Sequence, residues 1–116
     1  MNLFTAPEVI KNYAAAGKKK TELSVFRMLV LGILAGMFIA LGAAVTNTAA
    51  HTIADVSTAR IICGLLFPAG LSLVILMGGE LFTGNCLISI SVLEKETTTG
   101  MMLKNWLFVY IGNFIG

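Results

Sequence analysis

The stretch IICGLLFPAGLSLVILMGGELFTGNCLISISVL, residues 61–93, decides the fold of this chain. It holds 33 residues, of which one, Glu80, is charged. A continuous helix of that length would extend for about 50 Å, whereas the hydrocarbon core of a bilayer is about 30 Å thick. Three glycines and an asparagine within residues 78–85 favour irregular backbone and a new helix cap. We therefore predict non-helical backbone in this segment and a separate short helix after it.

The composition of the rest of the chain is that of an all-α transmembrane protein. Of its 116 residues 57% are hydrophobic and 12% charged, whereas about 25% charged residues is usual. Residues 28–45 carry no charge and are apolar all round, unlike the amphipathic helices of a soluble bundle. This run is too long and begins too late for a cleaved signal peptide. We predict helix one at about 28–49, a broken helix two at about 61–93 and helix three from about 101. Helix three shows no stop signal before residue 116, which indicates a chain truncated within a span.

Residues 1–27 form a segment that precedes the first span. Thr5 and Glu8 have the spacing of a capping box, which predicts an amphipathic helix that begins near Ala6 and lies on the membrane surface, with Gly17 as its end. The segment holds five of the eight basic residues, and cytoplasmic segments collect lysine and arginine. We therefore place the N-terminus and residues 94–104 in the cytoplasm. Binding of phospholipid or calmodulin by the lysines at 18–20 is the alternative explanation.

The cysteines, the histidine and the net charge indicate no metal, catalytic or nucleic-acid site. Cys63 and Cys86 form no CxxC motif or Cys/His cluster, and we expect neither a metal nor a cofactor. His51 follows helix one and is interpreted as a solvated loop residue. The net charge of +2 does not indicate a nucleic-acid partner, and nothing indicates an enzyme. Small residues at 32, 36 and 40 in helix one predict a face for close helix packing.

The string ILMGGELFTG, residues 75–84, resembles the signature of the formate/nitrite transporter family. That signature is an apolar pair, a free position, Gly, a small residue, an acidic residue or Ser, Leu, Phe, Thr, and Gly or Ser. GKKK at 17–20 and KNW at 104–106, which leads into YIGNFIG at 110–116, extend the resemblance. It implies an aquaporin-like helical bundle of two inverted three-helix repeats, assembled as a homopentamer in the lipid bilayer of the inner (cytoplasmic) membrane. This chain would be the first repeat, and the family's pore histidine and lysine would lie beyond residue 116.

The resemblance also implies a function and its residues. The protein would pass small monovalent anions of weak acids, and the loop 78–85 would gate the cytoplasmic side. An apolar constriction forces an anion to lose its hydration water before it can pass. The constriction residues would be Phe67, Leu71, Leu81 and Phe82, and the anion and gate loop would include Thr83, Gly84 and Asn85. We interpret Glu80 as fixing the loop, because a carboxylate in the pathway would repel the substrate. Asn85 is expected to cap a half-helix from Cys86.

Other functions explain the sequence less well. By composition alone the four constriction residues are ordinary lipid-facing or core residues. A small oligomeric membrane scaffold or pore-forming protein is the alternative, but it would not need a broken helix. A membrane anchor of a respiratory enzyme would need a histidine within a span, and the one histidine lies outside them. The sequence does not choose among formate, nitrite and hydrosulfide.

Overall fold

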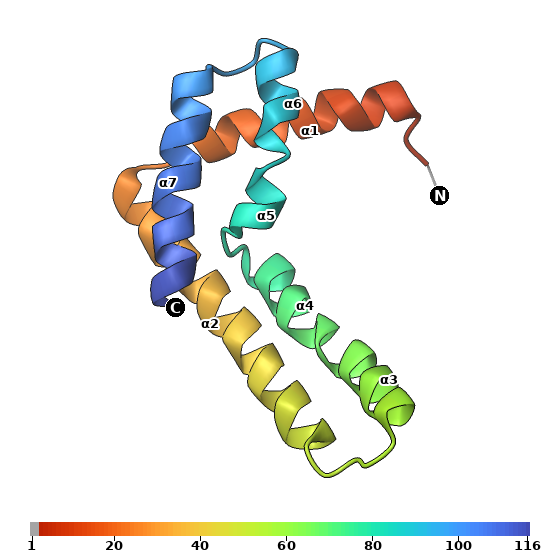
Figure 1. The fold of residues 1–116 in the computed structure, drawn as a ribbon. Coiled ribbons are helices and arrows are strands. Elements are labelled where there is room, and N and C mark those ends of the chain that lie inside the picture. Colours follow the sequence, from red (N-terminus) through yellow and green to blue (C-terminus); the bar gives the residue numbers. More distant parts are fainter. Residues whose placement is uncertain (1–2) are drawn as a thin grey trace.

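A computed structural model describes residues 3–116, and all regular structure in that range is helical (Figure 1). The seven helices are α1 (Ala6–Thr21), α2 (Val25–Ala50), α3 (Val56–Leu66), α4 (Pro68–Met77), α5 (Phe82–Asn85), α6 (Ile88–Leu93) and α7 (Thr99–Ile115). The long α2 is central, because α7 packs against one part of it and α3–α4 against another. Helix α1 lies across the opposite end of the molecule from the α2–α3 loop, transverse to α6 and α7.

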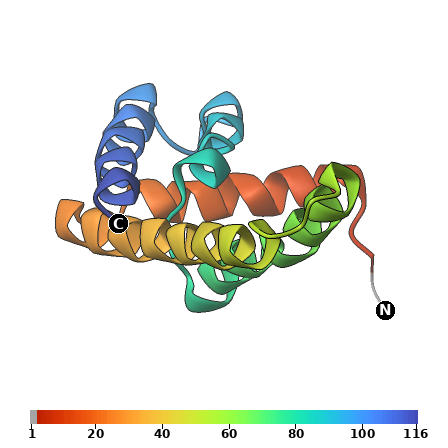
Figure 2. The same ribbon diagram turned by 60° about the horizontal axis from the view of Figure 1, so that its bottom comes forward.

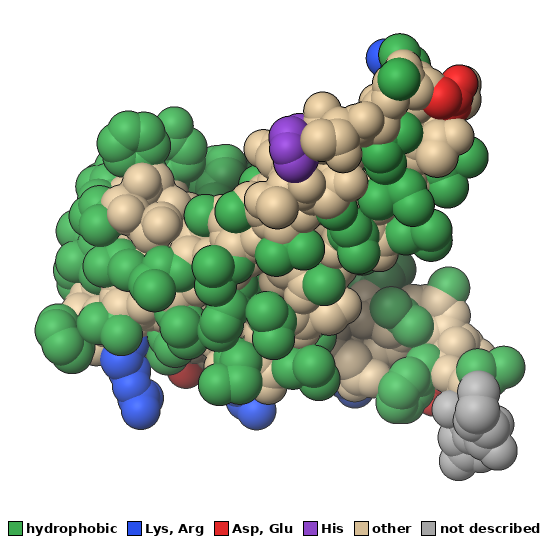
Figure 3. Space-filling model, turned by 90° about the horizontal axis from the view of Figure 1, so that it is seen from below, with side chains coloured by type: hydrophobic (Ala, Val, Ile, Leu, Met, Phe, Trp, Pro, Cys, Tyr) green, Lys and Arg blue, Asp and Glu red, His purple; other side chains and the backbone are tan. Residues whose placement is uncertain are grey.

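Within residues 3–116, two helical segments are long and apolar enough to cross a membrane. They are Val25–Ala50, which is α2, and Val56–Met77, which joins α3 and α4. Pro68 lacks the N–H that would bond to the carbonyl four residues earlier, and the helix is divided at that point. Hydrophobic side chains cover most of the face seen in Figure 3, and the charged side chains lie at its margins.

Small residues allow α2 to approach two different partners. A Cβ added to Gly32 would lie 3.1 Å from the Val109 carbonyl of α7, and one added to Gly42 would lie 3.1 Å from Gly70 of α4. The predicted packing face is wrong at its far end, because Ala40 is exposed. In this part of α2 the close helix contact is with α4 at Gly42, on a different side of α2 from the contact with α7.

Helix α1 begins as its capping box predicts. The Thr5 N–H and hydroxyl both donate to Glu8 Oε2, at 2.7 and 2.8 Å. The predicted end at Gly17 is wrong, since the helix continues to Thr21. Gly17 is instead buried at the crossing with α6, where an added Cβ would collide with the Ser91 hydroxyl. The residue is small because two helices touch there.

The helical backbone breaks between α4 and α5. Gly78 ends α4 in the left-handed region, with φ 69° and ψ 30°, and the Gly79 N–H donates to the Val74 carbonyl at 2.8 Å. The chain is non-helical through Leu81, and in the view of Figure 2 α4 and α5 lie on opposite sides of α2. The expected cap at Asn85 is wrong: Asn85 is the last residue of α5, and the next helix begins at Ile88.

Candidate functional site

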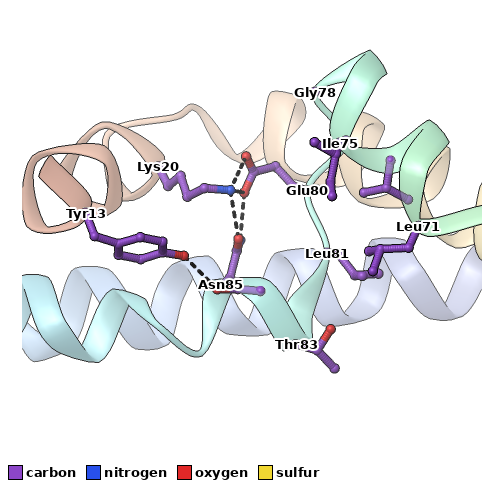
Figure 4. Close-up of a pocket in the computed structure, with 12 residues that line it drawn as sticks. Tyr13, Lys20, Leu71, Ile75, Gly78, Glu80, Leu81, Thr83 and Asn85 are labelled. Carbon is purple, nitrogen blue, oxygen red and sulfur yellow. Dashed lines mark hydrogen bonds and ion pairs between the residues drawn. The ribbon is translucent and has the colours of Figure 1, made fainter. Parts of the chain in front are cut away.

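The break in the second membrane helix borders a cavity of about 530 Å³ (Figure 4). Its lining comes from α1, α4 and the loop that runs from Gly78 to Asn85. Six residues singled out from the sequence line it: Leu71, Glu80, Leu81, Thr83, Gly84 and Asn85. The fold therefore brings most of the predicted site residues around one space.

Two of the predicted residues lie elsewhere. Phe67 is at the α3–α4 junction, one turn before Leu71, with 42% of its surface exposed. Phe82 packs against α7, with its ring centroid 6.0 Å from that of Trp106 and 5.4 Å from that of Tyr110, both edge to face. Phe82 is thus held by an aromatic cluster, and Leu81 is its neighbour that lines the cavity.

The Glu80 carboxylate is buried and has a cationic partner. Lys20, on α1, donates from Nζ to Glu80 Oε1 at 3.0 Å and to Oε2 at 3.1 Å. Asn85 Nδ2 donates to the same Oε2 at 2.7 Å, and Lys20 Nζ also donates to Asn85 Oδ1 at 3.0 Å. Figure 4 shows the three side chains converging beside the cavity. Burying a charge is costly unless it is paired and hydrogen-bonded, and this triad meets both conditions.

Asparagine side chains extend the network into α7. Asn85 Nδ2 donates to Asn105 Oδ1 at 2.8 Å, and Asn105 Nδ2 donates to the Lys20 carbonyl at 3.0 Å. The Trp106 Nε1–H donates to the Asn85 carbonyl at 2.8 Å. Asn85 and Asn105 are both fully buried. The end of α5 is therefore tied to α1 and α7 together.

A third asparagine, Asn113, contacts the broken backbone itself. Its Oδ1 accepts from the Phe82 N–H at 2.8 Å, and its Nδ2 donates to the Glu80 carbonyl at 2.8 Å. The same Nδ2 donates to the Gly32 carbonyl of α2 at 2.8 Å. The Glu80 N–H donates to the Leu31 carbonyl at 3.1 Å. Backbone groups that the break removes from helical pairing thus find partners on α2 and α7.

Tyr13 of α1 covers the loop from the side of the cavity. Its hydroxyl donates to the Gly84 carbonyl at 3.2 Å. Burial of the ring, and to a smaller extent the nearby charge of Glu80, raises the pKa of Tyr13 above its usual range. The phenol therefore stays protonated and available as a donor at neutral pH.

The residues that hold the loop are not among those that the sequence predicts for the site. The basic run at 18–20 predicts one shared role in topology for its three lysines. Lys20 nevertheless shares one face of α1 with Tyr13 and Gly17, while Lys18 and Lys19 are exposed. Asn105 and Asn113 belong to the strings that carry the family resemblance, which gives neither of them a structural role. Their signal was available, because an amide within an apolar span is costly unless it finds a hydrogen-bond partner.

The side chains that line the cavity differ in polarity. The cavity wall is apolar at Leu71 and Leu81, and the exposed Thr83 places a hydroxyl beside them. Because Lys20 compensates Glu80, the loop presents no unpaired negative charge at this point.

Comparison with known proteins gives one consistent family. A model described as formate/nitrite transporter matches residues 7–116. The formate channel BtFdhC of Bacillus thuringiensis is 36% identical over 117 residues, which cover 97% of this chain and 45% of that protein. A probable formate transporter of Methanothermobacter thermautotrophicus is 31% identical over 97% of this chain and 43% of its own length. The formate channel FocA of Escherichia coli K12 is 33% identical over 87% of this chain and 36% of its own length. The chain spans less than half the length of these relatives.

Proposed function

Because the chain belongs to the formate/nitrite transporter family, we propose that it forms part of a membrane pathway for small monovalent anions of weak acids. Formate is the first candidate, since several relatives are named formate channels or transporters, and nitrite and hydrosulfide share its charge and small size. The observation that carries the proposal is the broken helix whose loop lines a cavity. Non-helical backbone at membrane depth is tolerated where it is buried in protein or lines a passage.

The constriction in this proposal is apolar. Leu71 and Leu81 line the cavity directly. Phe67 lies one turn before Leu71, and Phe82, the residue after Leu81, packs against α7. An apolar constriction raises the free energy of a hydrated ion, which must shed water to pass. A monovalent anion loses less hydration free energy than a multiply charged one, and the width of the constriction excludes larger anions, so such a constriction selects by charge and by size.

The polar residues of the loop have separate roles in the proposal. Thr83 donates a hydrogen bond from its hydroxyl to an anion at the constriction, since it is an exposed residue of the cavity lining. Gly84 leaves open space where a side chain would otherwise project. Asn85 and Glu80 hold the loop in place through Lys20. The loop 78–85 in this way gates the cytoplasmic side.

The larger assembly follows from the family resemblance. We propose an aquaporin-like bundle of two inverted three-helix repeats, with this chain as the first, assembled as a homopentamer in the inner membrane. The N-terminus and α1 lie on the cytoplasmic side, because residues 1–27 hold five of the eight basic residues.

The test is anion flux through the natural full-length gene product in liposomes. Formate, nitrite and hydrosulfide uptake are compared for the parent, for Leu81→Ala combined with Phe82→Ala, and for Thr83→Val. The matched control is Leu76→Ala, because Leu76 is 79% exposed and lies outside the cavity lining. All proteins are compared at equal reconstituted amounts.

The double alanine variant should leak, with weaker discrimination by size, because it removes the Leu81 side chain from the constriction and the Phe82 ring that packs the loop against α7. Thr83→Val keeps the shape but removes the donor, and losing one hydrogen bond to a charged group costs about 1.5–3 kcal/mol, or roughly a ten- to hundredfold slower step. A parent protein that moves none of the three anions would favour the scaffold alternative. Variants that transport like the parent would show that the loop is not the constriction.

A further inference from the structure

Asn113 pairs with the loop backbone on both sides of Leu81. The Glu80 carbonyl, before Leu81, accepts from Asn113 Nδ2, and the Phe82 N–H, after it, donates to Asn113 Oδ1, each at 2.8 Å. Leu81 itself is extended, with φ −109° and ψ 127°. The amide of one side chain thus brackets one residue of the break.

This geometry is that of a strand pairing. In extended backbone the carbonyl before a residue and the N–H after it point to the same side, where a neighbouring strand supplies one donor and one acceptor. The Asn113 amide takes the place of that neighbour. The side chain of an extended residue stands roughly perpendicular to its pairing direction. Fixing the two bonds therefore fixes the direction of the Leu81 side chain, which lines the cavity.

The position of Asn113 is fixed by the close packing of α7 against Gly32 and Gly36 of α2. Its Nδ2 also donates to the Gly32 carbonyl at 2.8 Å. A Cβ added to Gly36 would lie 3.1 Å from the Asn113 Cα and closer still to its carbonyl. The amide is therefore presented to the loop by two packed helices.

We infer that Asn113 is a positioning residue for the constriction, which aims Leu81 into the cavity and so sets the largest anion that passes. The inference rests on the proposed function. Other contacts already secure the ends of the loop: Gly79 bonds back to α4, and Asn85 bonds to Lys20 and Asn105. Among the contacts of residues 3–116, Asn113 is the one partner of both the Glu80 carbonyl and the Phe82 N–H, while the Leu81 carbonyl, within α5's first turn, accepts from the Asn85 N–H at 2.9 Å.

The test measures size selectivity in the natural full-length gene product in liposomes. Asn113→Leu keeps a similar volume and removes both the donor and the acceptor. The probe pair is formate and acetate, which differ by one methyl group. Loss of about one net hydrogen bond to the aligned loop should raise the acetate-to-formate flux ratio about fivefold. The control is Phe114→Leu, because Phe114 is the next residue, is 85% exposed and does not line the cavity.

A merely structural role is separated by combining the variant with Leu81→Ala. If Asn113 acts through Leu81, adding Asn113→Leu to Leu81→Ala leaves the ratio where Leu81→Ala alone puts it. Two increases that multiply would overturn the inference. An unchanged ratio in Leu81→Ala would refute the constriction assigned to the loop in the proposed function, whereas a raised ratio there with a parental ratio in Asn113→Leu would refute only the inference.

A second variant covers the case in which Asn113→Leu does not assemble. Asn113→Asp retains the acceptor for the Phe82 N–H and loses both donors, so the Glu80 side of the pairing is released. Its acetate-to-formate ratio should rise in the same direction. A parental ratio in an assembled Asn113→Asp protein would overturn the inference.

Discussion

Lys20→Met should destabilise the protein far more than loss of either neighbouring lysine. Lys20 makes three hydrogen bonds through Nζ, to both oxygens of Glu80 and to Asn85, at 3.0–3.1 Å. Methionine keeps much of the side-chain length but leaves the Glu80 carboxylate without its cation. Because Glu80 is 6% exposed, water replaces that cation poorly.

The magnitude follows from burial on the two sides of the pair. Removing one partner of a fully buried ion pair costs about 3–5 kcal/mol. The Lys20 side chain is 30% exposed and that of Glu80 8%, so the pair is partly hydrated and we expect about 2–3 kcal/mol. At about 2–4 °C per kcal/mol, the apparent melting temperature of the purified protein in detergent should fall by roughly 5–10 °C.

Two comparisons identify the cause. Lys18→Met removes an exposed 3.5 Å ion pair with Glu96 and should cost less than about 1 kcal/mol. Lys20→Met combined with Glu80→Gln removes both charges, keeps an acceptor for Asn85 and should recover stability to within about 1 kcal/mol of the parent. The unpaired Glu80 carboxylate would not be the cause if Lys20→Met lost no more stability than Lys18→Met. The same conclusion would follow if the double variant were as unstable as Lys20→Met alone.

Three further outcomes are expected from the same geometry. In a cysteine-free background, a membrane-impermeant thiol reagent should label Asp55→Cys from outside and Thr98→Cys from the cytoplasm; the reverse would show that the basic N-terminus does not set the topology. Gly17→Ala should cost about 1–3 kcal/mol in thermal unfolding, since its Cβ collides with α6, whereas Gly100→Ala, with nothing within 4 Å, should be neutral. Hydrogen bonds from the N-cap residue Thr5 lower the pKa of Glu8. The stability that the Glu8 carboxylate adds to α1 is therefore fully present above the ordinary glutamate pKa, and it is lost as the pH falls through the lowered pKa. Amide NMR shifts of the cap should follow that transition and be flat in Glu8→Gln.

The broken helix was predictable because its two signals are local. The length of the apolar run exceeds the bilayer, and the glycines supply backbone freedom where the run must be interrupted. At Gly78 that freedom is used directly, since the residue is left-handed. The same local signal misplaced the second half-helix, because Asn85 is also what a helix cap looks like. Its side chain instead turns away from the backbone toward Glu80 and Asn105.

The contacts that hold the loop were not predictable from local pattern. Lys20 lies sixty positions before Glu80, and Gly32 lies eighty-one before Asn113. Nothing in the basic run at 18–20 distinguishes the lysine that is half-buried from the two that are exposed. That distinction depends on which face of α1 meets α6, and the small size of Gly17 marks this face only once the crossing is known.

The break and the asparagines of helix α7 are nevertheless one feature of the sequence. A backbone that leaves the helix within a membrane exposes peptide groups that neither lipid nor a helix of its own can satisfy. Those groups need amides or carbonyls from neighbouring helices, and an amide in an apolar span needs them in return. Asn105 and Asn113 lie eight residues apart, two turns along one face of α7, and both bond toward the loop region. Polar residues within an apolar helix therefore identify hydrogen-bond partners for the unpaired backbone of a neighbouring broken helix. Their spacing indicates which face of the apolar helix packs against that neighbour.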